Sequence, residues 1–227
     1  MRLRRLLPVA AAGLAAVYLR KVHRFRDPVR VLSAPAHDVV SPADGVVCFV
    51  RRVTGGAVEA GPDGRSMQVD ALLGMDSADG WLLGIALGPL DVHYTYQPVS
   101  GTIMAVTHQG SDRNVRLLNP LARAGLLASR PADLLAHPGI LTNERLSISM
   151  QAEAGPVTVT VIAAGRALDA MPYVKEGDRA RAGYKLAFLP HGGLVVVHLP
   201  ASLTPLAAVG DHVTGMQTVI ARPDSRP

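Results

Sequence analysis

The chain has 227 residues, enough to bury a core in one domain, and its single cysteine, Cys48, excludes a disulfide framework or a cysteine-based zinc site. Residues 1–30 hold eight of the 23 Lys and Arg residues and one of the 18 acidic residues, so the rest of the chain is slightly acidic despite the net charge of +5. Because aromatic residues also make up only 4% of the chain, this body is not expected to bind nucleic acid.

The first predicted element is an uncharged apolar run, Leu6 to Leu19, with basic residues on both sides. A helix of this length extends about 21 Å, which is shorter than the ~30 Å hydrocarbon core of a bilayer. A retained membrane anchor in residues 1–23, a cleaved secretory signal and a buried helix all remain open. The basic cluster after the run opposes translocation of the domain behind it, which favours an anchor on the cytoplasmic face of a membrane.

Two turn-and-strand units recur after the anchor. Pro-x-x-Gly occurs at residues 42–45 and at residues 98–101, and an apolar strand comes after it each time. Gly-Asp turns also occur twice, at residues 177–178 and 210–211. These half-repeats predict a mainly β (α+β) fold, an antiparallel barrel or sandwich that duplicates a hammerhead-like strand unit. Chance recurrence of common turn residues is the alternative.

The remaining elements complete one domain over residues 24–222, with a loose tail over residues 223–227. The segment from Leu117 to Ala136 predicts a surface insertion of one or two short helices broken at Pro131. Three strands are also expected: a buried one at residues 82–90, a half-exposed one at residues 157–163, and one buried on both faces at residues 194–197.

Five motifs occur in the order known from one family. They are FRDPVR (residues 25–30), VVSPADG (39–45), GPLDVHYTYQPVSG (88–101), NER (143–145) and, where that family has its cleavage strand, HGGLVVVHLP (191–200). Through them the chain resembles a phosphatidylserine decarboxylase of the short, membrane-anchored type over about residues 22–222. The resemblance implies a role in phosphatidylethanolamine synthesis and a membrane phospholipid as partner.

The resemblance also implies a covalent mechanism. Such proenzymes cleave themselves before a serine that comes after glycine, and the serine becomes a pyruvoyl group that binds the substrate amine and takes up electrons as CO2 leaves. Asp44 matches the aspartate that promotes self-cleavage, and His93 matches an active-site histidine. A second histidine of some members falls at Tyr96, which with His191 is a candidate for substrate binding.

The cleavage position departs from this pattern, because Gly192 matches the glycine and Gly193 matches the serine. Glycine has neither the nucleophilic oxygen nor the Cβ that become the pyruvoyl group, so no such cofactor is expected at Gly193. Ser202 is the nearest downstream alternative, and Lys185 is the lysine nearest in sequence for a pyridoxal cofactor, although no phosphate-binding glycine loop accompanies it. His191 and His198 are seven residues apart on one strand and face opposite sides, so no metal site is expected.

Two functions therefore stay open. The first is a non-catalytic relative that keeps the fold, the anchor and a headgroup pocket, and works with a second copy or with a partner enzyme of phospholipid synthesis. The second is an active decarboxylase with an unidentified precursor residue. If the site keeps its geometry, Asp44 and His93 should lie near Gly193. Otherwise Asp44 is a turn residue, His93 is part of the scaffold, and Glu144 with Arg145 is a surface ion pair.

Overall fold

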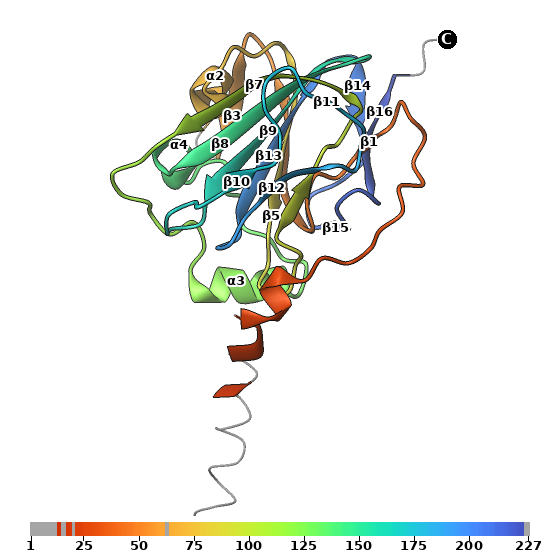
Figure 1. Cartoon of the computed structure of the whole chain (residues 1–227). Coiled ribbons are helices and arrows are strands. Elements are labelled where there is room, and N and C mark those ends of the chain that lie inside the picture. Colours follow the sequence, from red (N-terminus) through yellow and green to blue (C-terminus); the bar gives the residue numbers. More distant parts are fainter. Residues whose placement is uncertain (1–12, 15–16, 20, 62–63, 225–227) are drawn as a thin grey trace, which may run out of the picture.

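A computed structural model describes residues 13–14, 17–19, 21–61 and 64–224 of the chain (Figure 1). The strand expected at residues 194–197 lies within β13 (Gly193–Pro200), which pairs antiparallel with β9 (Gly155–Ala163) on one side and β5 (Gly80–Ala86) on the other. Every residue of β13 is buried. Alternate side chains enter two different apolar clusters, which explains why the apolar run is continuous.

The strands form a sandwich-like arrangement, which is the second of the two predicted alternatives. The large antiparallel sheet has the order β11-β7-β8-β9-β13-β5-β2-β15, and its further strands are β11 (Arg179–Ala180), β7 (Gly101–Gln109), β8 (Arg145–Ala152), β2 (Gly45–Val53) and β15 (His212–Val213). Among the described strands this sheet stays open and does not close into a barrel.

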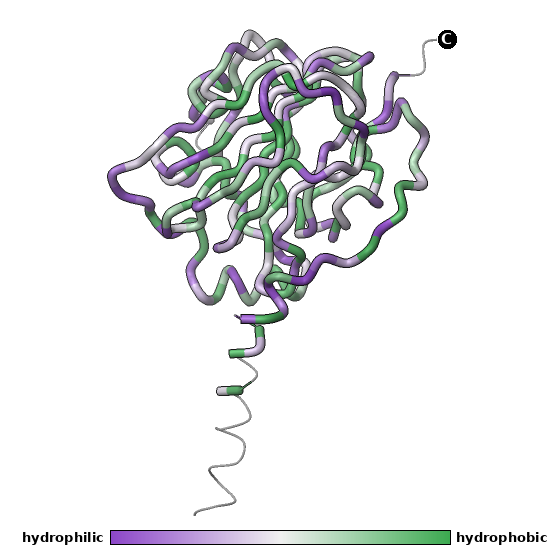
Figure 2. The backbone as a smooth tube through the Cα atoms, viewed as in Figure 1, coloured by the Kyte–Doolittle hydropathy of each residue, from purple (hydrophilic) through white to green (hydrophobic). Residues whose placement is uncertain are grey.

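Two small sheets cover one face of the large sheet, and a hairpin with short helices covers the other. The small sheets are β1 (Val39–Val40), β16 (Val219–Pro223) and β14 (Leu203–Pro205), and β10 (Met171–Pro172), β12 (Lys185–Phe188) and β6 (Tyr94–Tyr96). The other face carries β3 (Ala57–Ala60), β4 (Arg65–Gln68), α2 (Val69–Leu73), α3 (Pro120–Leu126) and α4 (Gly139–Thr142). Hydrophobic residues are concentrated along the central strands (Figure 2).

The internal repeat is confirmed by matching hydrogen bonds. The Gly177-Asp178 turn exchanges two backbone hydrogen bonds of 2.8 and 2.9 Å with Ile103, the third residue of β7. The Gly210-Asp211 turn exchanges two of 2.9 Å with Val47, the third residue of β2. Each turn then leads into a two-residue strand that pairs with the start of the same long strand. Chance recurrence of turn residues would not produce this agreement.

Two expectations about secondary structure were wrong. β9 is buried on both faces instead of half-exposed, because it lies between β8 and β13, and its Thr160 hydroxyl is hydrogen-bonded to Ser147 at 2.8 Å. The buried strand expected to reach Leu90 ends at Ala86. In the predicted helical insertion, α3 ends at Leu126, before Pro131, whereas Leu134 and Leu135 are buried in irregular structure.

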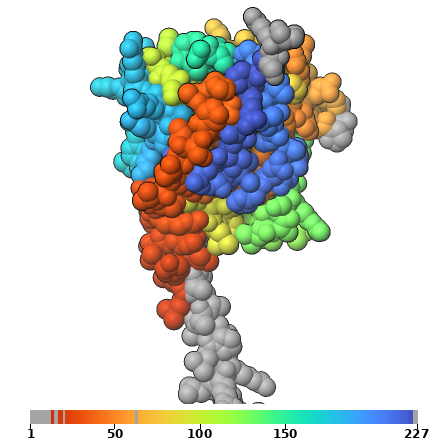
Figure 3. Space-filling view, turned by 90° about the vertical axis from the view of Figure 1, so that its right-hand side faces the viewer, coloured from red at the N-terminus to blue at the C-terminus, as the bar shows by residue number. Residues whose placement is uncertain are grey.

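The predicted anchor, residues 1–23, falls largely outside the described residues. Within the part of the chain that the structure describes, no helix is both long and apolar enough to cross a bilayer. The first described element of the domain is the 3-10 helix η1 (His23–Phe25), and an extended segment then runs up the surface beside the C-terminal strands (Figure 3). At the other end β16 includes Pro223, Asp224 donates its backbone N–H to Ser202, and the rest of the predicted tail lies outside the described residues.

Candidate functional site

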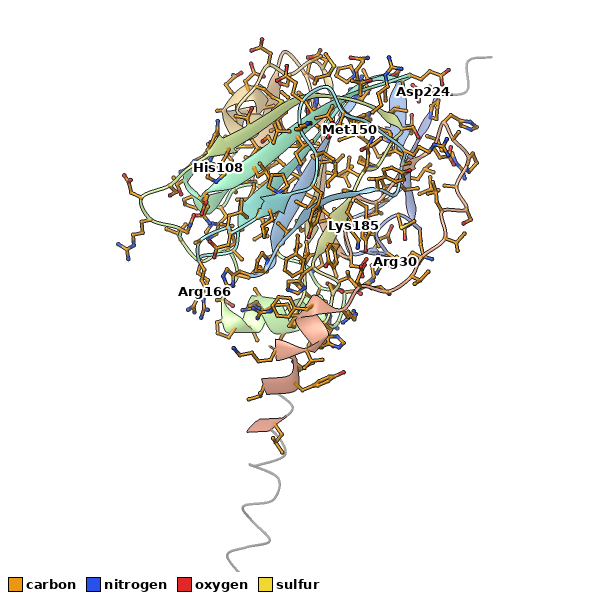
Figure 4. All side chains as sticks on the ribbon, viewed as in Figure 1. Arg30, His108, Met150, Arg166, Lys185 and Asp224 are labelled. Carbon is orange, nitrogen blue, oxygen red and sulfur yellow. The ribbon has the colours of Figure 1, made fainter. Side chains whose placement is uncertain are left out.

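A cavity of about 530 Å³ opens where β13 begins and β5 has ended. Its lining includes Gly192, Gly193, His191 and His93, so four of the predicted site residues meet here. η1 and α3 also contribute lining residues, and Arg166, another of them, lies beside α3 at the lower end of the molecule (Figure 4). The site is therefore at the end of the domain where the N-terminal segment enters.

Gly192 occupies a tight turn at the cavity. Its N–H donates to the carbonyl of Leu189 at 3.0 Å, and its φ of +66° is in the left-handed region, which favours glycine. A Cβ on Gly192 would lie 3.5 Å from Nε2 of His93. The turn thus brings the backbone of Gly192 directly beside the imidazole.

His93 presents a hydrogen-bond acceptor to this turn. Its Nδ1 lies 2.9 Å from the carbonyl oxygen of Asp91, and because a carbonyl only accepts, Nδ1 carries the proton and Nε2 has the lone pair. The side chain is buried, and this desolvation lowers the pKa of His93, with a smaller effect from the positive charges of Arg24 and Arg26. The imidazole is therefore neutral near pH 7.

Gly193 has no room for a side chain. It pairs with Ala163 of β9, and a Cβ built on Gly193 would lie 2.5 Å from the carbonyl oxygen of Ile162. A contact with a backbone atom of a central strand cannot be relieved by rotating a side chain. The residues present therefore do not fit a pyruvoyl group at this position, since both the Cβ and the space for it are missing.

Asp44 does not line the cavity. Its two carboxylate oxygens accept hydrogen bonds of 2.6 and 2.7 Å from the guanidinium of Arg30, and the backbone N–H groups of Gly215 and Val92 donate to it at 2.8 and 3.3 Å. The side chains of Asp44 and Arg30 are 9% and 7% exposed. The carboxylate is thus bonded to Val92, the residue just before His93. Its oxygens already accept hydrogen bonds from Arg30, Gly215 and Val92.

The internal repeat explains part of this arrangement. Ser100 precedes Gly101 as Asp44 precedes Gly45, and the Ser100 hydroxyl accepts a hydrogen bond of 3.1 Å from the backbone N–H of Ala182. In the other half Asp44 accepts the equivalent bond from Gly215. This contact is therefore a structural feature common to both repeats, whereas the ion pair with Arg30 is particular to Asp44.

Tyr96 belongs to the same cluster as Arg30 and Asp44 and not to the cavity lining. The Arg30 guanidinium lies 5.4 Å from the centre of the Tyr96 ring, as in a cation–π contact. Burial raises the pKa of Tyr96 to about 12. Tyr96 is thus neutral and packs against the ion pair.

The NER motif fastens loops to the sheet. Asn143 accepts a hydrogen bond of 2.8 Å from the N–H of Val115 and donates one of 2.7 Å to the carbonyl of Ala163. Glu144 contacts His108 at 2.9 Å, while Arg145 donates to backbone carbonyls, among them that of Ala71 at 3.0 Å. The interpretation of Glu144 and Arg145 as a surface ion pair was wrong, because each has other partners.

Sequence reasoning missed the charge of the cavity. Four of its lining residues are arginines, namely Arg24, Arg116, Arg123 and Arg166. Two of them, Arg116 and Arg123, lie within residues 113–130, which contain no acidic side chain, and that local absence was the available signal. At the rim, His191 is hydrogen-bonded to Asp169 at 3.1 Å.

Comparisons with known proteins agree on one family. The family model described as phosphatidylserine decarboxylase matches residues 18–221. A phosphatidylserine decarboxylase proenzyme of Novosphingobium aromaticivorans is 30% identical over 89% of this chain and 72% of its own length. One from Mycobacterium leprae is 29% identical over 97% of this chain and 76% of its own length. With most of its length matched by the family model, the chain belongs to the phosphatidylserine decarboxylase family.

Proposed function

We propose that this chain is a non-catalytic member of its family, in which Gly193 stands in place of the self-cleaving serine. It would serve phospholipid metabolism by binding a ligand in the cavity and not by decarboxylating it. The observation that carries this proposal is the contact at Gly193, where a Cβ would lie 2.5 Å from the Ile162 carbonyl. If the chain had lost only the serine side chain and kept the surrounding geometry, this position would still have space for a serine.

The other residues around the cavity support the same proposal. The described lining residues include no serine, threonine, cysteine or lysine, so they offer no side-chain precursor of a pyruvoyl group and no amine for a pyridoxal cofactor. Ser202 lies past the far end of β13 and donates to the carbonyl of Ala154 at 2.7 Å. Lys185 is paired with Asp27 and lies 4.4 Å from the centre of the Tyr94 ring.

The mass of the purified chain tests this proposal most directly. We expect one polypeptide of about 23.9 kDa, no adduct with hydrazine or borohydride, and no labelled CO2 released from phosphatidylserine labelled at the serine carboxylate. A self-cleaving relative, processed in parallel, serves as the positive control. Two fragments, the second with a blocked amino terminus, would instead establish the alternative, an active decarboxylase with another precursor residue.

Membrane attachment through the N-terminal segment is the second part of the proposal. Described residues that lead into the domain expose large apolar side chains, with Leu14 71%, Val17 58% and Val22 55% exposed. Exposed apolar side chains next to Lys21 and Arg24 suit an interface with anionic lipid. The family's association with lipid agrees with this location.

Deleting residues 1–21 is expected to move the protein from the membrane fraction to the soluble fraction while its urea midpoint stays unchanged. The reason is that both apolar clusters of the core lie in the domain and include no described residue before Val39. Fractionation and urea denaturation of the full and shortened chains check this expectation. Persistent pelleting of a folded shortened chain would show that the membrane contact lies elsewhere.

A further inference from the structure

The mouth of the cavity is strongly positive. Arg24 of η1, Arg116, Arg123 of α3 and Arg166 come from three separate segments, and no aspartate, glutamate or lysine is found among the described residues that line it. Arg116, Arg123 and Arg166 are exposed, and none forms an ion pair with a described carboxylate. Exposed guanidinium groups are weakly hydrated and accessible, so they can bind a ligand.

The backbone holds two of these arginines next to each other. Asn143 binds Val115 and Ala163 together, which fixes the residues just before Arg116 and just before the loop that carries Arg166. Gly165 completes the approach, because a Cβ at this position would lie 2.7 Å from Cα of Arg116. A buried amide and a glycine with a φ of +123° thus bring like charges to one rim.

The interior below the arginines is apolar and uncharged. Leu117, Leu134 and Leu194 line it and are 5%, 3% and 0% exposed. His93 adds a neutral imidazole with a lone pair at Nε2. A ligand therefore finds mainly positive charge at the mouth and an apolar floor, and the carboxylate at the rim, that of Asp169, is hydrogen-bonded to His191.

We infer that the cavity binds a phosphate monoester on a glycerol or acylglycerol group and selects it over phosphodiesters that carry an amine. Arginines suit a phosphate monoester because its two charges and three terminal oxygens accept several guanidinium donors at once. An ethanolamine headgroup pairs its single phosphate charge with an ammonium group, and a serine headgroup adds a carboxylate but keeps that ammonium group, which this mouth repels. The inference rests on the proposed function. Without a pyruvoyl group to bind it covalently, the amine of a headgroup has no favourable contact in this cavity.

Calorimetry on the intact full-length chain in nonionic detergent, with its mass checked first, tests the selectivity. Glycerol 3-phosphate is expected to bind at least about tenfold more tightly than glycerophosphoserine, because only the first is a monoester. Flotation with phosphatidylcholine vesicles that contain phosphatidic acid, or phosphatidylserine at the same mole fraction, then distinguishes a lipid source from a soluble one. Binding to phosphatidic acid vesicles identifies the lipid, and binding to glycerol 3-phosphate alone identifies a soluble phosphate.

The double variant R116A/R166A is expected to weaken binding of glycerol 3-phosphate at least about tenfold, since two charge-assisted contacts are lost. R65A/R179A is the matched control, because it removes the same charge from two exposed arginines that do not line the cavity. That control should change affinity less than about twofold. Urea midpoints of both variants should equal that of the unmodified chain.

Three results would overturn the inference: no binding of glycerol 3-phosphate or phosphatidic acid, equal affinity for the monoester and the serine diester, or equal loss in the two double variants. Each of these leaves the proposed function intact if the chain is uncleaved. A cleaved chain overturns the proposed function instead, and the mass measurement shows this before any ligand is added.

Discussion

Replacing Asp44 by alanine is expected to lower the free energy of unfolding by about 3–5 kcal/mol, because it leaves the buried guanidinium of Arg30 without its counter-charge. Burial acts to lower the pKa of Arg30, but the hydrogen bonds and charge of Asp44 outweigh it and raise the pKa. Although the variant loses this effect of Asp44, a guanidinium is too basic to lose its proton near pH 7, so Arg30 stays charged. The Gly215 N–H also loses its acceptor.

Two further variants separate these contributions. D44S keeps an acceptor for the Gly215 N–H, as Ser100 does for Ala182 in the other repeat. It should therefore be more stable than D44A by the contribution of this one hydrogen bond, which does not involve Arg30. R30M/D44S removes both charges and should be more stable than D44S alone, because no unpaired charge remains buried.

The exposed pair between Arg51 and Asp133, whose side chains are 36% and 35% exposed, provides the matched control. R51A should cost less than about 1 kcal/mol. Urea denaturation of all four variants gives the comparison. If D44A cost no more than R51A, Asp44 would not be a structural residue, and a role in chemistry would again be needed to explain it.

The contacts of Asp44 also change how its motif is interpreted. The resemblance led to the prediction that Asp44 promotes self-cleavage, yet its partners are Arg30 and two backbone N–H groups. Both kinds of contact are structural: the bond from Gly215 belongs to the repeated turn, and the bonds from Arg30 form a buried ion pair. Its presence is therefore weak evidence for activity.

The features that sequence predicted best are local or repeated. β13 was identifiable because its apolar run admits no exposed face, and the two Pro-x-x-Gly units were identifiable because each glycine begins a long strand. Gly45 and Gly101 share a physical reason: a Cβ would lie 2.5 Å from the carbonyl of Ala86 and 2.3 Å from that of Gln151, respectively. The same lack of space at the start of each long strand explains why glycine occurs at both positions.

The features that sequence did not predict depend on distant partners. Alternation of Thr and Val in β9 suggested an exposed face, but Ser147 of β8 satisfies Thr160 within the sheet. Arg116 and Arg166 are far apart in the chain and reach the same cavity because Asn143 joins their segments and Gly165 packs closely against Arg116. No period or spacing in the sequence encodes such a contact.

Introducing a serine at Gly193 is expected to destabilise the protein by roughly 3 kcal/mol and to produce no cleavage, because the added Cβ meets the Ile162 carbonyl of the neighbouring strand β9. G193A has the same Cβ without the hydroxyl and should lose nearly as much stability. Agreement between the two variants would assign the cost to steric contact with β9. Urea denaturation measures this cost, and mass spectrometry after prolonged incubation measures cleavage.

G192S provides the contrasting control one residue away. Its Cβ would lie 3.5 Å from Nε2 of His93, an ordinary contact, so its cost should come only from the φ of +66°, about 1–2 kcal/mol. If G193S instead folded as stably as the unmodified chain and cleaved itself before residue 193, the strand would have kept the geometry for self-cleavage. Loss of a single hydroxymethyl side chain would then separate this chain from an active enzyme. The structure argues against that outcome, because β9 would have to move before a serine could fit.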